Sequence, residues 1–223
     1  MRPLLLVLAA SILAGCTDRA SGPAVVDGTF PSVDDGAANA GFAVFRDSLR
    51  AVVARRDTAA LVATVGEGAR LSFGDAAGGP DGLRAMWFAG SPPGGEPLWA
   101  VLGRLLDAGS VEEDGAVTVP YVFGAWPDSV DAFTHVAVVG DRVEARLAGS
   151  DTAGVAALVS HAILPVGSPA SGPATGDYQA VRLPDGTEAF VPAASVMSPV
   201  GYRATFFPDE AGAWKLQTLV AGD

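Results

Sequence analysis

The chain has few of the side chains that most often build catalytic or metal centres. Its 223 residues include one cysteine, two histidines and, at position 215, a single lysine. The lone cysteine, Cys16, cannot form an intrachain disulfide, and two histidines are too few for a histidine-rich metal cluster. The sequence therefore predicts neither a metal centre nor a bound cofactor.

The two histidines also lack the neighbours that catalysis requires. Ser160 and His161 are adjacent on a predicted strand, where consecutive side chains point to opposite faces, so they cannot act as nucleophile and base. His135 lies near apolar residues and is expected in the core or at an interface. No glycine-rich phosphate-binding pattern follows a predicted strand. We therefore predict that the protein is not an enzyme.

Positive charge is scarce as well. The chain carries 14 Lys and Arg residues against 25 Asp and Glu residues, a formal net charge of -11. This balance argues against a nucleic-acid partner and against electrostatic adsorption to an anionic membrane. Hydrophobic residues make up 49% of the chain, enough for the core of one compact body or of two small ones.

The N-terminus has the proportions of a secretory signal. Arg2 supplies a positive charge, and residues 3–13 are apolar apart from Ser11. This run is too short to span a membrane, because a transmembrane helix needs about 20 apolar residues. It ends in Leu13-Ala14-Gly15-Cys16, with the only cysteine of the chain in the last position.

These four residues resemble the lipobox of bacterial lipoproteins. The resemblance implies that residues 1–15 are a signal peptide, that cleavage falls between Gly15 and Cys16, and that Cys16 carries acyl chains. Thr17 in place of an aspartate implies the outer membrane, facing the periplasm, in a host with two membranes. The alternatives are an ordinary secretory signal with a chance cysteine, or a buried apolar helix.

Residues 16–41 predict a flexible, lipidated tether. Gly22-Pro23, Pro31 and Asp34-Asp35-Gly36 interrupt any regular period, and small residues fill the gaps. Only Val25-Val26 and Phe30 suggest a docking contact.

Residues 42–132 predict a mainly helical domain. Asp57 is expected to cap a second helix that stops near Gly66 or Gly68. A short strand is expected at 69–73, and further helices are expected after Asp81 and from Pro97. The first helix is indicated by apolar residues at spacings of three and four, at Phe42, Phe45, Leu49, Val52 and Val53. The charged residues Arg46, Asp47, Arg50 and Arg55 are expected on its other face.

The order of helix, short helix and strand over residues 42–73 resembles the start of the cone-shaped NTF2-like fold. In that fold, helices line one side of a curved sheet. The resemblance implies a pocket, formed by the helices and the C-terminal hairpin, that binds a small molecule or carries an enzymatic site. This is the main alternative to a non-catalytic protein.

Residues 133–199 predict a small barrel of short strands separated by turns. An arginine-bearing strand at 143–146 leads into a small-residue loop at 148–154, and an apolar run follows at 155–166. Two further strands, 178–183 and 188–191, flank an Asp-Gly pair that favours a tight hairpin.

This order resembles the bacterial SH3 (SH3b) domain. SH3b domains commonly bind peptides or cell-wall fragments through loop aromatic residues. The resemblance implies possible ligand contacts at Arg146, Tyr178 and Phe190. From the residues alone, Phe190 can equally fill the barrel and Arg146 can equally brace the loop.

Residues 200–223 predict a terminal β-hairpin. Residues 202–207 and 214–220 alternate by twos around a turn at 208–212. A hairpin this apolar cannot stand alone in water, so we expect it to pack back on the helical part, with the SH3-like part inserted between them. Trp126 is expected at the interface of the two bodies.

The sequence thus predicts an α+β protein of the cell envelope, anchored to the membrane through an N-terminal lipid. Its SH3-like domain is expected to act as a non-catalytic binding or assembly module. The expected partner is a peptide, a peptidoglycan fragment or another envelope protein. A structural spacer without a specific ligand is the third possibility.

Overall fold

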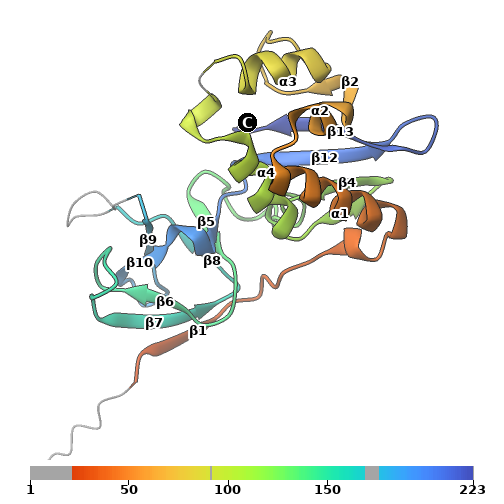
Figure 1. The fold of residues 1–223 in the computed structure, drawn as a ribbon. Coiled ribbons are helices and arrows are strands. Elements are labelled where there is room, and N and C mark those ends of the chain that lie inside the picture. Colours follow the sequence, from red (N-terminus) through yellow and green to blue (C-terminus); the bar gives the residue numbers. More distant parts are fainter. Residues whose placement is uncertain (1–21, 91, 169–175, 223) are drawn as a thin grey trace, which may run out of the picture.

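The computed structural model describes residues 22–90, 92–168 and 176–222 and has a mixed α+β fold made of two bodies (Figure 1). The helix–sheet body contains α1 (Ala40–Arg55), α2 (Thr58–Ala63), α3 (Gly79–Trp87) and α4 (Leu98–Asp107), with β2 (Val65–Arg70), β3 (Val111–Glu113), β4 (Ala116–Val119), β12 (Arg203–Pro208) and β13 (Trp214–Val220). The strand body contains β1 (Ala24–Asp27), β5 (His135–Val138), β6 (Val143–Arg146), β7 (Val155–Ser160), β8 (Ala162–Pro165), β9 (Tyr178–Arg182), β10 (Glu188–Pro192) and β11 (Val196–Met197). Three 3-10 turns, η1 (Asp35–Ala37), η2 (Pro93–Gly95) and η3 (Ala193–Ser195), and the short α5 (Tyr121–Gly124) complete the elements.

The first two helices form where the sequence predicts them. Asn39 caps α1 by accepting a hydrogen bond from the backbone N–H of Phe42 at 3.1 Å, and Arg56 ends the helix in the left-handed region. Asp57 caps α2 by accepting from the N–H of Ala60 at 3.0 Å, as expected. The predicted apolar stripe of α1 is buried, except that Phe45 is only partly covered.

The five-stranded sheet has the order β2-β13-β12-β4-β3, and the predicted C-terminal hairpin, β12 and β13, is its centre. β2 begins at Val65, earlier than the strand expected at 69–73, and it includes Gly66. A Cβ on Gly66 would lie 2.7 Å from the amide end of Gln217 on β13, a flexible side chain that can move aside.

The core of the helix–sheet body lies between α1, α4 and the sheet. Phe42 of α1 packs against Phe206 of β12 and Trp214 of β13, with ring centroids 5.5 Å and 5.1 Å apart. Phe42, Phe206 and Leu106 of α4 are fully buried. The hairpin therefore packs on the helical part, as the sequence predicts.

The strand body is inserted between two neighbouring strands of this sheet. β4 pairs with β12, with Val119 opposite Ala204, although β5–β11 lie between them in the chain. The expected insertion is therefore confirmed, and Figure 1 shows the two bodies side by side with β5 near the junction.

In the strand body, two open sheets take the place of the closed barrel expected for residues 133–199. The described strands form the orders β1-β7-β6-β10-β9 and β11-β5-β8, joined by a bridge between Val166 and Val181. β1 pairs with β7, so among the described strands β1 and β9 are the two edge strands of the first sheet, and they do not pair with each other. The Asp185-Gly186 hairpin between β9 and β10 forms as predicted, with Gly186 at φ 87°.

The flexible tether expected for residues 16–41 is wrong for most of its described part. Residues 24–38, here called the N-terminal strap, are attached to both bodies. β1 pairs in parallel with β7, and Phe30 is buried against Tyr121, with ring centroids 5.3 Å apart. The contact suggested for Val25-Val26 and Phe30 is therefore confirmed, because apolar burial and strand pairing outweigh the glycine and proline signals.

Among the described residues, no helix is long and apolar enough to cross a lipid bilayer.

Candidate binding site between the two bodies

The three residues predicted to contact a ligand do come together at one end of the strand body. Phe190 of β10 is the pairing partner of Arg146 of β6. A Cβ on Gly149 would lie 3.5 Å from both Phe190 and Tyr178, so this glycine fits between the two rings.

Each of these three side chains also has a structural role. Arg146 donates a hydrogen bond to the carbonyl of Ala153 at 2.7 Å and pairs with Glu144, so it braces the loop of residues 147–154. Tyr178 donates to Asp151, and this hydrogen bond raises the pKa of the Tyr178 hydroxyl. Phe190 is buried. Ligand contact at these residues stays a prediction.

His161 does not contact the Ser160 hydroxyl, and His135 Nδ1 lies 3.0 Å from the hydroxyl of Thr134. His161 adopts a left-handed conformation between β7 and β8, and its Nε2 lies 3.1 Å from Asp141 Oδ1. Ser160 Oγ instead accepts from the N–H of Arg142 at 3.0 Å. His135 is half-buried at the start of β5. In the described part of the chain, no group of three or more His, Cys, Asp or Glu residues could hold a metal ion.

Trp126 lies at the junction, as predicted. It packs edge-on against Phe30 of the strap, with ring centroids 5.8 Å apart, and its Nε1 donates to the carbonyl of Val130 at 2.9 Å. Tyr121, Val122 and Ala137 are the other buried residues of this small core, which joins the strap, α5 and β5. Cys16 and Gly15 lie outside the described residues.

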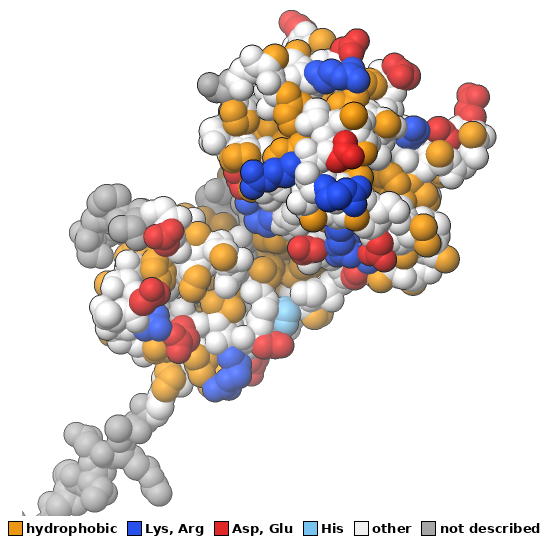
Figure 2. Space-filling model, viewed as in Figure 1, with side chains coloured by type: hydrophobic (Ala, Val, Ile, Leu, Met, Phe, Trp, Pro, Cys, Tyr) orange, Lys and Arg blue, Asp and Glu red, His pale blue; other side chains and the backbone are white. Residues whose placement is uncertain are grey.

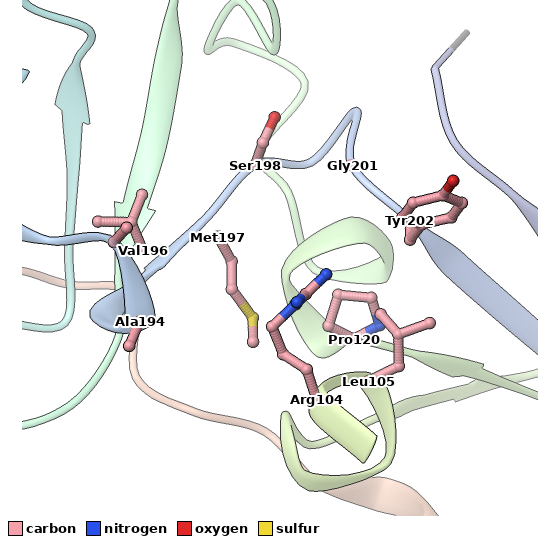
Figure 3. Close-up of a pocket in the computed structure, with 10 residues that line it drawn as sticks. Arg104, Leu105, Pro120, Ala194, Val196, Met197, Ser198, Gly201 and Tyr202 are labelled. Carbon is pink, nitrogen blue, oxygen red and sulfur yellow. The ribbon is translucent and has the colours of Figure 1, made fainter. Parts of the chain in front are cut away.

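Two neighbouring cavities lie between the bodies, with volumes of about 420 and 510 Å³. Both are lined by Arg104 of α4 and by Ala194 and Met197 of the strand body. Figure 3 shows the side chains of Arg104 and Met197 extending toward the same space, with Pro120 and Leu105 beside Arg104. In Figure 2, hydrophobic side chains gather at the waist between the bodies. We call these two cavities together the interbody cleft.

The cation of the cleft is already paired. Arg104 donates two hydrogen bonds to the carboxylate of Glu96, one of them 3.0 Å long. The hydrogen bond and charge of Glu96 raise the pKa of Arg104, and Arg104 in turn lowers the pKa of Glu96. Burial, helped by the charge of Glu96, raises the pKa of Tyr202 on the cleft wall, so its hydroxyl stays protonated at neutral pH.

At the other end of the cleft, the strap is fixed by a polar network. Asp34 Oδ1 accepts from Arg46 and from Ser110 Oγ, both at 2.6 Å. The Arg46 side chain is 7% exposed and the Asp34 side chain 40%. Burial alone would raise the pKa of Asp34, but the hydrogen bonds from Arg46 and Ser110, with the charges of Arg46 and Arg50, lower it.

This network predicts an acid-dependent loss of stability. Because the folded-state pKa of Asp34 lies below its ordinary value of 3.8, its contribution is complete above that pH and is lost as the pH falls through the folded-state pKa. We expect Asp34→Asn to lower the free energy of unfolding by about 1 kcal/mol at pH 7, and to flatten its decline below pH 4. Denaturant unfolding of both proteins between pH 7 and pH 3 measures this.

Asp47→Asn is the matched control for Asp34→Asn. Asp47 pairs with Arg50 at 3.3 Å on the surface, with its side chain 76% exposed, so we expect a change of at most about 0.5 kcal/mol. Parallel pH profiles for wild type and Asp34→Asn would contradict the role of Asp34.

Compared with models of known protein families, with curated proteins and with solved structures, the chain gives no match. No local motif marks the residues of the interbody cleft either. Arg104 occupies a position on an ordinary amphipathic helix, and Met197 lies in a two-residue strand. The cleft forms because the inserted strand body places Ala194 and Met197 opposite Arg104 of α4.

Proposed function

We propose that this protein is a lipid-anchored protein of the cell envelope that binds a peptide segment without catalysing a reaction. Its anchor is the acylated Cys16, in the outer membrane of a host with two membranes, facing the periplasm. The interbody cleft holds the ligand. The peptide belongs either to another envelope protein or to the cell wall.

The observation that carries this proposal is the position of the cleft. Its two cavities share Arg104, Ala194 and Met197 in their walls, so both bodies contribute to each cavity. Ligand sites occur preferentially between domains, where apolar walls carry a few fixed polar groups. Here the walls are mainly apolar. The Arg104–Glu96 ion pair and the Tyr202 hydroxyl supply the polar groups of the first cavity, and Asp34 and Asp107 supply those of the second.

The neighbouring strand favours an extended peptide as the ligand. β11 is the edge strand of the order β11-β5-β8, and Val196 and Met197 both line the first cavity. A peptide can add to such an edge through main-chain hydrogen bonds and place alternate side chains in neighbouring cavities. The charged groups that line the cleft, Arg104, Asp34 and Asp107, are each paired with an opposite charge, which suits a ligand without strong charge.

A pull-down with the lipid-free protein tests the binding. Purified cell-wall sacculi and an envelope-protein extract are the two matrices, and they distinguish the two sources of peptide. We expect Met197→Glu to reduce retention at least about tenfold, equivalent to about 1.4 kcal/mol, because it places a charge in the apolar cleft.

Phe133→Glu is the control, because Phe133 is 66% exposed on the strand body and lines neither cavity. It should be retained like the wild type. Tyr178→Ala tests the SH3-like loop separately. Loss of retention in Tyr178→Ala but not in Met197→Glu would place the ligand at that loop. If neither matrix retains the wild type, the binding proposal is wrong and the protein is a structural spacer.

The NTF2-like alternative is a pocket between the helices and the C-terminal hairpin. The strand order β2-β13-β12-β4-β3, with α1 packed on the sheet, supports the resemblance for the helix–sheet body. However, Phe42, Leu49 and Phe206 fill the space where such a pocket would lie, each at most 2% exposed. The interbody cleft is therefore the better-supported site.

A further inference from the structure

β1 leaves only a short length of chain between the proposed anchor and the folded protein. Gly22 is the first described residue, and Ala24 already pairs with Ala157 of β7. Cys16 and Gly22 are six residues apart, so the chain between them spans at most roughly 20 Å. A flexible tether as far as Phe42 would reach roughly 90 Å by the same measure.

The pairing of β1 also determines which end of the strand body lies nearest the anchor. β1 and β7 are parallel, so their first residues lie at the same end. Residues 147–154 form the loop that precedes β7, closed by a hydrogen bond from the N–H of Leu147 to the carbonyl of Gly154 at 2.9 Å. Leu147 is 58% exposed and presents an apolar side chain there.

We propose that this end of the strand body, formed by the start of β1 and residues 147–154, rests on the surface of the phospholipid bilayer. The cleft and the helix–sheet body then face away from the membrane. The inference rests on the proposed lipidation of Cys16, and its physical basis is the short connection to Gly22. Figure 1 shows the chain entering the strand body at the end away from the helix–sheet body.

The lengths involved support this orientation. A compact unit of the size of the strand body is roughly 25 Å across. The connection of roughly 20 Å is shorter than the width of the strand body. The chain therefore cannot reach past the strand body to bring the helix–sheet body to the membrane. On this end Glu144 is paired with Arg146, but Asp151 carries a negative charge, so contact with the bilayer depends on the short connection and on Leu147 and not on charge attraction.

Gly28 is the residue that keeps the connection short. A Cβ at this position would lie 2.1 Å from the backbone carbonyl oxygen of His161, an atom that cannot move aside. The N–H of Gly28 also donates to the carbonyl of Ser160 at 2.7 Å. Gly28→Ala should therefore detach β1 from β7, whereas a Cβ on Gly22 would meet no atom within 4 Å.

The test uses full-length lipidated protein reconstituted in vesicles that contain a headgroup-spin-labelled lipid. Because acylation consumes the thiol of Cys16, one introduced cysteine can carry a fluorophore. Thr152→Cys places it in the loop of residues 147–154, and Ala211→Cys places it in the exposed turn between β12 and β13. We expect strong quenching at Thr152 and none above background at Ala211.

The strap variants are combined with the Thr152 reporter. Gly28→Ala should lose most of the quenching at Thr152, and Gly22→Ala should keep it. Equal quenching at both reporter positions, or quenching unchanged by Gly28→Ala, would overturn the proposed orientation while leaving the anchor intact. Failure of the wild type to associate with vesicles would instead overturn the anchor, and the orientation with it.

Discussion

Cys16→Ser moves the protein from the membrane fraction to the soluble fraction: this is the largest effect that we expect from any single substitution. Each buried methylene of an acyl chain contributes about 0.8 kcal/mol to membrane binding, so several chains on one cysteine form a practically permanent anchor. A formal net charge of -11 offers no electrostatic replacement on an anionic membrane. Fractionation of cells followed by immunoblotting measures the loss.

Two controls separate loss of the lipid from failure to process the signal. Thr17→Ser leaves the lipobox intact and should stay with the membranes. A second variant replaces residues 1–15 and Cys16 with an ordinary cleavable secretory signal, and it should be soluble even if Cys16→Ser accumulates as a precursor. If this second variant still sediments with membranes after a salt wash, the lipid is not the anchor.

The second large effect is expected for Phe42→Ala, in the core of the helix–sheet body. Phe42 is fully buried and contacts the rings of Phe45, Phe206 and Trp214. Truncating a buried phenylalanine leaves a cavity that its neighbours fill only partly, so the free energy of unfolding should fall by about 3–5 kcal/mol.

Tryptophan fluorescence during denaturant unfolding is a suitable measurement, because Trp214 lies against Phe42 and no tryptophan belongs to the strands of the strand body. Val44→Ala is the matched control on the same helix. Val44 is 70% exposed, so its truncation should change stability by at most about 0.5 kcal/mol. A loss below about 1 kcal/mol for Phe42→Ala would show that the core does not depend on this ring.

Elements with a strong local pattern can be read from the sequence without the structure. The apolar stripe of α1, the caps at Asn39 and Asp57 and the alternation of β12 and β13 all act between residues near in the chain. The cap of α2 at Asp57 was expected, and the cap of α1 at Asn39 was not. The apolar residues of α1 follow the expected spacings of three and four. The Asp185-Gly186 turn forms for the same reason, because a left-handed glycine suits a tight hairpin.

Local patterns mislead where a distant partner changes the balance. Gly66 reads as the end of α2, but α2 ends at Ala63 and Gly66 lies in β2, which pairs with β13. The glycines and prolines of the N-terminal strap read as a tether, but β7 supplies a free strand edge for β1. Arg46 reads as a solvent-facing residue of α1, but it is buried beneath Asp34.

The sequence by itself determined the α+β class, the main helices and the terminal hairpin, whereas the insertion of the strand body was a hypothesis until the pairing of β4 with β12 showed it. The class, the helices and the hairpin depend on periodicity and turn chemistry, which act over a few residues. Only the tertiary structure decided that the strap joins the bodies, that the small sheets stay open and that a cleft lies beside Arg104 and Met197. Those features depend on contacts between residues far apart in the chain, which no local pattern encodes.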